Sequence, residues 1–140
     1  METIVKLNKW ANENTNIGTD MLRVLFGAFI FYKGTFFLNQ TDYLTELLPG
    51  DGTEGVYFIL VHYVALAHIC GGLFIIMGLL TRVCSLLQVP ILIGAIAVNF
   101  TGTMDYFNIA QASAALAFCF CFLFYGSGRH SVDYALKLNM

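Results

Sequence analysis

Hydrophobic and polar positions alternate along this chain on the scale of whole segments rather than of single residues. Short polar stretches separate four apolar runs, each close to the length of a membrane-spanning helix. We place these runs at about Met21 to Leu38, Tyr57 to Leu79, Val83 to Phe100 and Ile109 to Tyr125. Backbone groups in lipid need hydrogen bonds within their own segment, which favours helices. The pattern therefore predicts an all-α membrane protein, a bundle of four transmembrane helices in residues 21–140.

The segment before the first run has a pattern of its own. Its apolar residues recur at helical spacing opposite polar ones, the apolar set being Ile4, Leu7, Trp10 and Ala11. This predicts that residues 1–20 form a cytoplasmic, amphipathic N-terminal segment whose short helix lies flat on the membrane. Thr19 or Asp20 is expected to cap the first span. Outside the membrane, Asp42 to Leu48 is predicted as a second short amphipathic piece, stopped by Pro49.

Composition agrees with a lipid environment. Apolar residues make up 58% of the 140 residues, charged residues only 11%, and the mean hydropathy is +0.71. A soluble domain of this length cannot bury so much apolar surface. The formal net charge of −2 leaves no basic surface, so nucleic acid is excluded as an expected partner.

Charge also predicts the orientation. Apart from Lys33 within the first run, the cations lie on one side of the four runs, at Lys6, Lys9, Arg23, Arg82, Arg129 and Lys137. The other two connections carry no Lys or Arg but contain the acidic residues Asp42, Glu46, Asp51, Glu54 and Asp105. By the positive-inside bias both termini are cytoplasmic, and we expect a multi-pass protein of the cell inner membrane.

Polar side chains within the apolar runs are the candidate ligand-binding residues. Lys33, His62, Asn99 and Gln111 fall at a similar depth on the four different spans, and His68 lies near mid-membrane. For Lys33, a cation that snorkels to the interface and one that faces a polar pocket both remain open. For His68, the alternatives are a neutral imidazole bonded across the bundle and a proton carrier or ligand contact. Together the five predict a polar intramembrane pocket suited to a carbonyl-bearing or anionic group such as a quinone head group.

Other chemistry has weaker support in the sequence. His62 and His68 project about 240° apart on one helix, so they cannot both ligate one haem within a single chain. The four cysteines include no C-x-x-C pair and share no spacing with the histidines, which favours structural roles over thiol or metal chemistry. Close helix packing is expected at two stripes of small residues, Ala67, Gly71 and Gly78 on the second span and Ala110, Ala114 and Ala117 on the fourth.

Three ordered motifs carry a resemblance to a known family. The first is Arg23-Val24-Leu25-Phe26-Gly27 followed by Lys33-Gly34; the second is Gly71-Gly72-Leu73 followed by Gly78-Leu79-Leu80-Thr81-Arg82; the third is Gly126-Ser127-Gly128-Arg129-His130-Ser131-Val132-Asp133. In this order the chain resembles the DoxX-type membrane proteins. The resemblance implies a four-helix inner-membrane protein, with family members associated with quinone-linked or sulfur-linked electron transfer and with oxidative-stress complexes. Many relatives place an acidic residue where this chain has His68, so a lysine–carboxylate pair inside the bundle is in doubt here.

Three functions follow as hypotheses. The first is a non-catalytic accessory subunit of a larger respiratory or redox-linked membrane complex, since the sequence contains no complete catalytic constellation. Its partners would be lipid and other membrane-protein subunits. The second is a quinone-reactive redox protein that uses the polar pocket, with quinone as the one candidate cofactor. The third is a small-molecule transporter, which lacks support because no broken helix or inverted repeat is evident.

Overall fold

The computed structural model describes residues 16–39, 54–101, 105–128 and 130–136, together with Trp10 and Glu13. Within these ranges all regular structure is helical. Four long helices, α2 (Ile17–Asn39), α4 (Glu54–Met77), α5 (Thr81–Thr101) and α6 (Tyr106–Tyr125), are followed by the short α7 (Val132–Ala135). The expected all-α fold with four long helices is confirmed.

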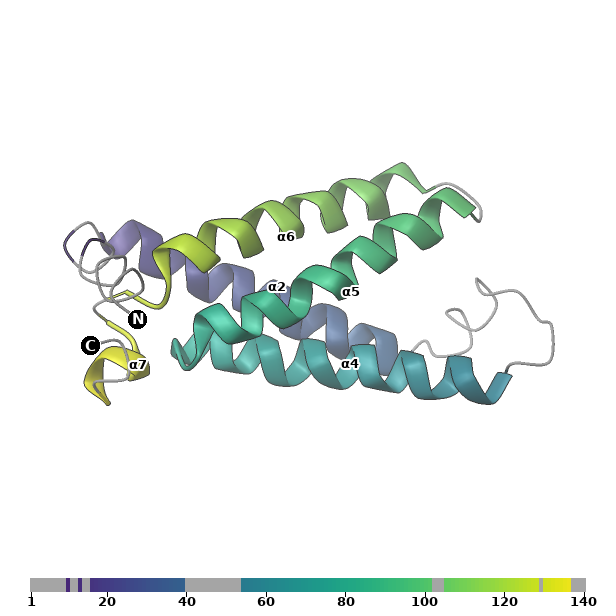
Figure 1. Ribbon diagram of the computed structural model, residues 1–140, viewed down its shortest axis with the longest axis horizontal. Helices are drawn as coiled ribbons and strands as arrows, with labels where there is room; N and C mark the ends of the chain where they lie inside the picture. Colours follow the sequence, from purple (N-terminus) through teal and green to yellow (C-terminus); the bar gives the residue numbers. More distant parts are fainter. Residues whose placement is uncertain are drawn as a thin grey trace.

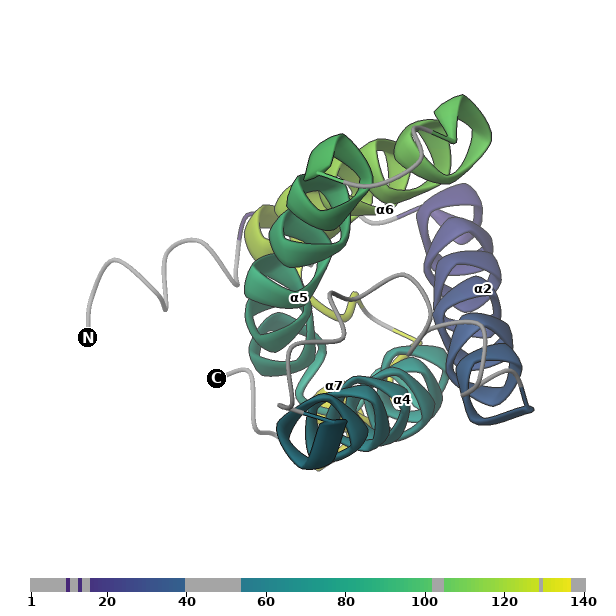
Figure 2. The same ribbon diagram turned by 90° about the vertical axis from the view of Figure 1, so that its right-hand side faces the viewer.

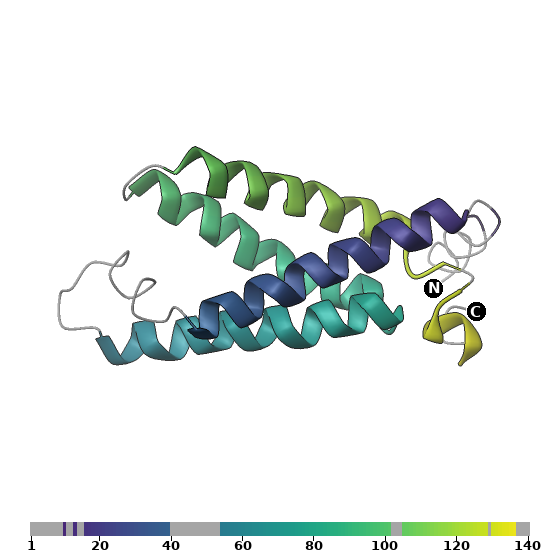
Figure 3. The same cartoon turned by 180° about the vertical axis from the view of Figure 1, so that it is seen from behind.

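The four long helices are arranged as two packed pairs. Helix α2 packs along α4, and α5 packs along α6, while α2 and α6 touch only weakly. Viewed end-on, the order around the bundle is α2, α4, α5 and α6 (Figure 2). From the side, α5 starts beside α4 near α7 and crosses towards α6, so that the two pairs diverge with distance from α7 (Figures 1 and 3). We call the end that carries α7 the α7 end and the opposite one the far end.

All four long helices are long and apolar enough to cross a membrane, over Ile17–Asn39, Phe58–Met77, Thr81–Phe100 and Tyr106–Tyr125. Each of them presents large apolar side chains outward, such as Leu25, which is 67% exposed, and Ile59, which is 69% exposed. Exposure of this extent around a whole bundle requires lipid as the surrounding medium. The chain is a multi-pass membrane protein.

Side-chain capping explains where two helices begin. Asp105 accepts a hydrogen bond from the Phe107 N–H at 2.9 Å, so α6 begins at Tyr106, three residues earlier than expected. For α2 the predicted cap was wrong, because Thr19 and Asp20 lie inside its first turn. The Thr19 hydroxyl instead reaches back to Asn16, accepting from its N–H at 3.2 Å and donating to its carbonyl at 2.6 Å. This satisfies backbone groups that a helix start would otherwise leave open.

A tight turn at Gly78 to Leu80 joins α4 to α5. Gly78 has φ of 70° and Leu80 has φ of 48°, and both values reverse the chain in a left-handed conformation. Leu80 tolerates this conformation because its N–H donates to the Asp133 carboxylate at 2.9 Å, while the Asp133 N–H donates to the Gly78 carbonyl at 3.1 Å. Helix α7 is thus fastened to the α4–α5 turn.

Three glycines bring α2 and α4 close together. A Cβ atom on Gly72 would lie 2.5 Å from the Phe31 nitrogen, and one on Gly27 or Gly34 would lie 2.8 Å from the backbone nitrogen of Ile76 or Ile69. Of the two small-residue stripes expected from the sequence, the one on the second span lies at a close contact with α5, where Gly71 faces Gln88 and the Ala67 carbonyl accepts from the same amide. The stripe on α6 (Ala110, Ala114 and Ala117) is exposed, so the packing expected there is not found within the chain. The α6 residues that are buried are Ala115, Cys119 and Phe122.

The apolar core follows from the same packing. Its buried members come from all four helices: Phe26, Ile30, Ile75, Cys84, Leu92, Ala115, Cys119 and Phe122. Of the predicted N-terminal segment, residues 1–20, the structure describes Trp10, Glu13 and residues 16–20, and Ile17 to Asp20 belong to α2. The Trp10 ring lies 5.4 Å from that of Tyr125. Ile4, Leu7, Ala11 and the predicted piece Asp42 to Leu48 lie outside the described residues.

Candidate functional site

A cavity of about 470 Å³ lies between the two helix pairs. All four long helices contribute to it, and each contributes residues from its half nearer the far end. The cavity is where the pairs diverge, because no close glycine contact joins α5 or α6 to α2 at this level. A volume of this order suits a small organic ligand.

Most of the cavity wall is apolar. Phe29, Phe36 and Phe37 of α2 face aliphatic side chains of α4 and α5, including Val64 and Leu92. Flat aromatic rings and branched aliphatic groups form a surface that favours an apolar or aromatic ligand over a hydrated ion. The wall alone is therefore suited to a lipid-soluble molecule.

The cation in the cavity is Lys33, whose side chain is partly buried. Its Nζ lies 5.9 Å from the centroid of the Phe29 ring and 5.7 Å from that of Phe36. Aromatic faces at this distance stabilise an ammonium group by cation–π attraction without neutralising its charge. No salt bridge joins Lys33 to a carboxylate among the described residues. The ammonium group is thus available to an anionic or carbonyl-bearing ligand.

His68 lies at the inner limit of the cavity on α4 and is only 3% exposed. Its Nδ1 lies 3.1 Å from the Val64 carbonyl oxygen. A carbonyl can only accept, so Nδ1 carries the hydrogen, and Nε2 of the neutral ring is an acceptor. The Phe37 ring contacts the imidazole edge-on at 5.6 Å between centroids. His68 therefore offers a hydrogen-bond acceptor at this end of the cavity.

Amide side chains lie at the other limit of the cavity, near the far end. Asn99 of α5 accepts from the Asp105 N–H at 3.1 Å, and Asn108 donates to the Asp105 carboxylate at 2.8 Å. Gln111, one turn further along α6, has a buried Oε1 without a hydrogen-bond partner. Asp105 thus holds two of the amides in place, while Gln111 retains unused hydrogen-bonding capacity beside the cavity.

Four of the five residues singled out from the sequence line this one cavity: Lys33, His68, Asn99 and Gln111. The fifth, His62, does not. Its Nδ1 donates to the Phe58 carbonyl at 2.8 Å, and its ring lies 4.0 Å from the Phe58 ring. Whether the four bind a ligand stays a prediction. Asn108 also lines the cavity and was missed, because the fourth apolar run was taken to begin one residue after it; its spacing of three from Gln111 was the available signal.

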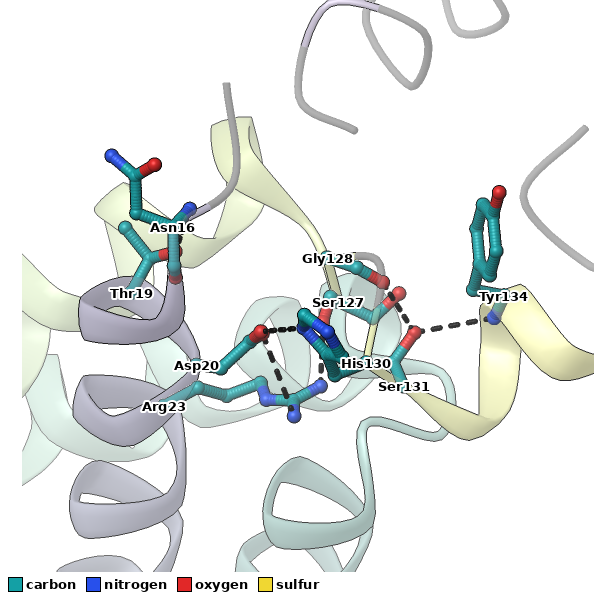
Figure 4. Close-up of polar contacts among 9 residues, drawn as sticks. All are labelled: Asn16, Thr19, Asp20, Arg23, Ser127, Gly128, His130, Ser131 and Tyr134. Carbon is teal, nitrogen blue, oxygen red and sulfur yellow. Dashed lines mark hydrogen bonds and ion pairs between the residues drawn. The ribbon is translucent and has the colours of Figure 1, made fainter. Parts of the chain in front are cut away.

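A second polar cluster lies at the α7 end and was not predicted as a unit. Arg23 of α2 is 3% exposed, and its Nη1 donates to the Ser127 carbonyl at 2.5 Å (Figure 4). Its Nη2 lies 3.8 Å from a carboxylate oxygen of Asp20, whose other oxygen is 2.7 Å from His130 Nδ1. Ser131 accepts from the Tyr134 N–H at 3.2 Å and caps α7. These contacts tie the chain after α6 onto the start of α2.

The last part of this cluster is the C-terminal end of α6. Gly126 ends the helix with φ of 68°, and its N–H donates to the Phe122 carbonyl at 2.8 Å. Arg82 of α5 donates to the Phe124 carbonyl at 3.1 Å, where it partners one of the last carbonyls of α6. With Arg23 and Asp133, it gives the α7 end polar contacts to α2, α4, α5 and α6.

Cysteines and metal ligands are dispersed. Cys84 and Cys119 are buried, Cys70 and Cys121 are exposed, and all four are free thiols. Within the described ranges no three histidine, cysteine or acidic side chains lie close enough to hold a metal ion. The cavity is consequently the strongest candidate for a functional site.

Comparison with known proteins gives a family. The family model described as DoxX matches residues 18–102, which is more than half of the chain. The matched range includes the first two sequence motifs and Lys33, His68 and Asn99, but ends before Asn108, Gln111 and the closing glycine-rich motif. Searches of curated proteins and of solved structures gave no match.

Proposed function

The chain belongs to the DoxX family, and from this premise we propose that it binds a quinone-type ligand in the cavity as an accessory subunit of a redox-linked membrane assembly. The observation that carries the proposal is the combination of an apolar, phenylalanine-rich wall with polar groups at both of its limits. A quinone has the same division between a lipid-soluble body and carbonyl oxygens that accept hydrogen bonds.

The donors in the cavity suit such a head group. The Lys33 ammonium can donate to one carbonyl oxygen, and Gln111 of α6, which also lines the cavity, can donate from its amide Nε2. Phe29 and Phe36 offer ring faces on which the quinone ring can stack. In this proposal the chain's own residues bind and orient the ligand, and electrons reach it from a partner subunit.

The orientation of the protein forms part of the proposal. Of the described cations, Arg23 and Arg82 lie towards the α7 end and Lys33 towards the far end; of the described acidic residues, Asp20 and Asp133 lie at the α7 end and Glu54 and Asp105 at the far end. In the sequence, Lys6 and Lys9 precede α2, and Arg129 and Lys137 follow α6. On the positive-inside bias we assign the α7 end to the cytoplasm and the protein to the inner membrane.

The accessory role has its own support. The exposed stripe Ala110, Ala114 and Ala117 runs along α6, away from the core. Small residues on a lipid-facing surface let another helix approach closely. The stripe is a suitable contact for a neighbouring subunit. Replacing Ala114 with Leu should leave the thermal stability within about 0.5 kcal/mol of wild type and reduce copurification of partner subunits after mild detergent extraction. Undiminished copurification with Ala114→Leu would exclude this face as the contact.

Quinone binding is tested by calorimetric titration of a short-chain ubiquinone into the protein in lipid nanodiscs. Lys33→Met should weaken binding about ten- to a hundredfold, because a hydrogen bond from a charged donor contributes about 1.5–3 kcal/mol. Ser113→Ala, an exposed polar residue on α6 outside the cavity, is the matched control and should bind as the wild type does. Equal affinities for the wild type and Lys33→Met, with normal helical content, would refute the proposal.

A further inference from the structure

One face of α5 carries three polar side chains that the cavity does not use. Thr81, Ser85 and Gln88 follow one another at intervals of four and three residues, so they share a face of the helix. All are fully buried, with exposed fractions of 0%, 0% and 1%. They lie between the α7 end and the cavity, whose nearest α5 residue is Pro90.

Each of the three has an oxygen without a protein partner. Thr81 Oγ1, Ser85 Oγ and Gln88 Oε1 are buried and accept or donate no hydrogen bond within the described part of the chain. Within a lipid-embedded bundle an unsatisfied polar atom costs free energy that folding must offset. Such atoms in native proteins are normally satisfied by bound water.

The position of Gln88 is fixed by its neighbours on α4. Its Nε2 donates to the Ala67 carbonyl at 2.9 Å, and the site of a Cβ on Gly71 is taken up by the same amide. Ala67 precedes His68, which lines the cavity. Gln88 therefore lies next to the inner limit of the cavity, with its Oε1 still unpaired.

The polar face of α5 begins, at Thr81, beside the polar cluster of the α7 end. Thr81 follows Leu80, whose N–H is bound to the Asp133 carboxylate. The helical rise separates Thr81 from Ser85 by about 6 Å and Ser85 from Gln88 by about 4.5 Å, spacings that a single water can bridge with two hydrogen bonds.

We propose that Thr81, Ser85 and Gln88 hold a file of bound water molecules that connects the α7 end to the cavity. Through this file, protons from the α7 end would reach the part of the cavity that holds the ligand's head group. The water file stands independently of any ligand. Its use in supplying protons rests on the proposed quinone function, since a quinone that is reduced takes up protons at its carbonyl oxygens.

The charged and titratable groups around the file are consistent with this role. At the α7 end, Asp133 faces its entrance, and Arg23 and Arg82 are engaged with the Ser127 and Phe124 carbonyls. Buried Cys84 precedes Ser85 on α5, and Cys70 of α4 is exposed outside the file. At the cavity end, His68 and Lys33 follow. Exposed His130, bonded to Asp20, is a further titratable group at the α7 end.

The experiment is water-edited solid-state NMR of the isotope-labelled full chain in lipid bilayers. Magnetisation from water should reach Thr81, Ser85 and Gln88 early and should reach the dry core residues Ile75 and Cys119 late. After transfer to deuterated buffer, the Gln88 side-chain amide should exchange. Ser85→Leu, which fills the middle of the file, should abolish exchange at Gln88 and leave Thr81 hydrated. Ser85→Ala removes the hydroxyl without adding bulk and should slow exchange of the Gln88 amide. Ser113→Ala should leave that exchange unchanged.

Two results would overturn the water file. One is transfer of water magnetisation to Thr81, Ser85 and Gln88 that is as slow as transfer to Ile75 and Cys119. The other is unchanged exchange at Gln88 in a folded Ser85→Leu protein, which would mean that water arrives from the cavity side. Titration of the same samples with a short-chain ubiquinone separates the two proposals, because a dry file with normal quinone binding refutes only the file. A wet file without quinone binding refutes only the proposed function.

Discussion

The two ends of the bundle use polar residues in opposite ways. At the α7 end, Arg23 and Asp133 are buried and bonded to backbone groups of other segments, so that these polar contacts fasten the helices together. Towards the far end, Lys33 and Gln111 line a cavity and keep hydrogen-bonding capacity that no other described residue uses. A buried polar residue in a membrane is costly in both places. At the α7 end this cost is offset by hydrogen bonds to the backbone. In the cavity the unused hydrogen-bonding capacity indicates a site for a ligand.

Packing shows the same division. The α2–α4 pair is held by backbone contact at Gly27, Gly34 and Gly72, whereas the two pairs separate around the cavity. Three predictions test whether the difference between a structural and a binding region is real.

The largest effect is expected at the α2–α4 contact. Gly72→Leu should destabilise the bundle by more than about 3 kcal/mol, because the added side chain meets the Phe31 backbone, which cannot move aside without separating the helices. Thermal unfolding in detergent, followed by circular dichroism, measures the change. Gly18→Ala is the control, since a Cβ there has nothing within 4 Å. A Gly72→Leu protein as stable as the control would show that the pair is not held by close contact.

An intermediate effect is expected at the α7 end. Arg23→Met should lower the free energy of unfolding by about 2 kcal/mol, because it removes a charged hydrogen bond to the Ser127 carbonyl from a buried site. Chemical unfolding in mixed micelles measures this loss. His130→Ala, on an exposed residue of the same cluster, should cost much less. Equal losses for the two variants would contradict a structural role for Arg23.

The smallest effect on stability is expected in the cavity. Lys33→Met should change the free energy of unfolding by less than about 1 kcal/mol, because the ammonium group makes no salt bridge with a described residue and its removal relieves the cost of holding a charge in the membrane. The same unfolding assay checks it. A loss as large as that for Arg23→Met would make Lys33 a structural residue and would weaken the division between the two ends.

Much of the fold, and part of the candidate site, could be predicted from the sequence. The four helices follow from apolar runs of membrane-spanning length, and their ends were placed within a few residues. Short breaks in the apolar pattern, the turn at Gly78 to Leu80 and the polar stretch that ends at Asp105, separate the last three helices. The candidate polar layer was found in large part because intramembrane polar residues are rare enough to stand out. His62 was included for its depth alone, which does not reveal that its side chain bonds to the preceding turn.

The sequence by itself determined that this chain is an all-helical membrane protein, because the free energy of inserting a segment depends on its local composition and length. The tertiary structure alone decided which helices touch. Small residues occur on several faces, and the contact between Gly27 and Gly72 depends on the rotation of both helices. It also decided that Lys33, His68, Asn99 and Gln111 share one cavity and that Arg23 reaches Ser127. These relations join residues far apart in the chain, and only the packed geometry specifies them.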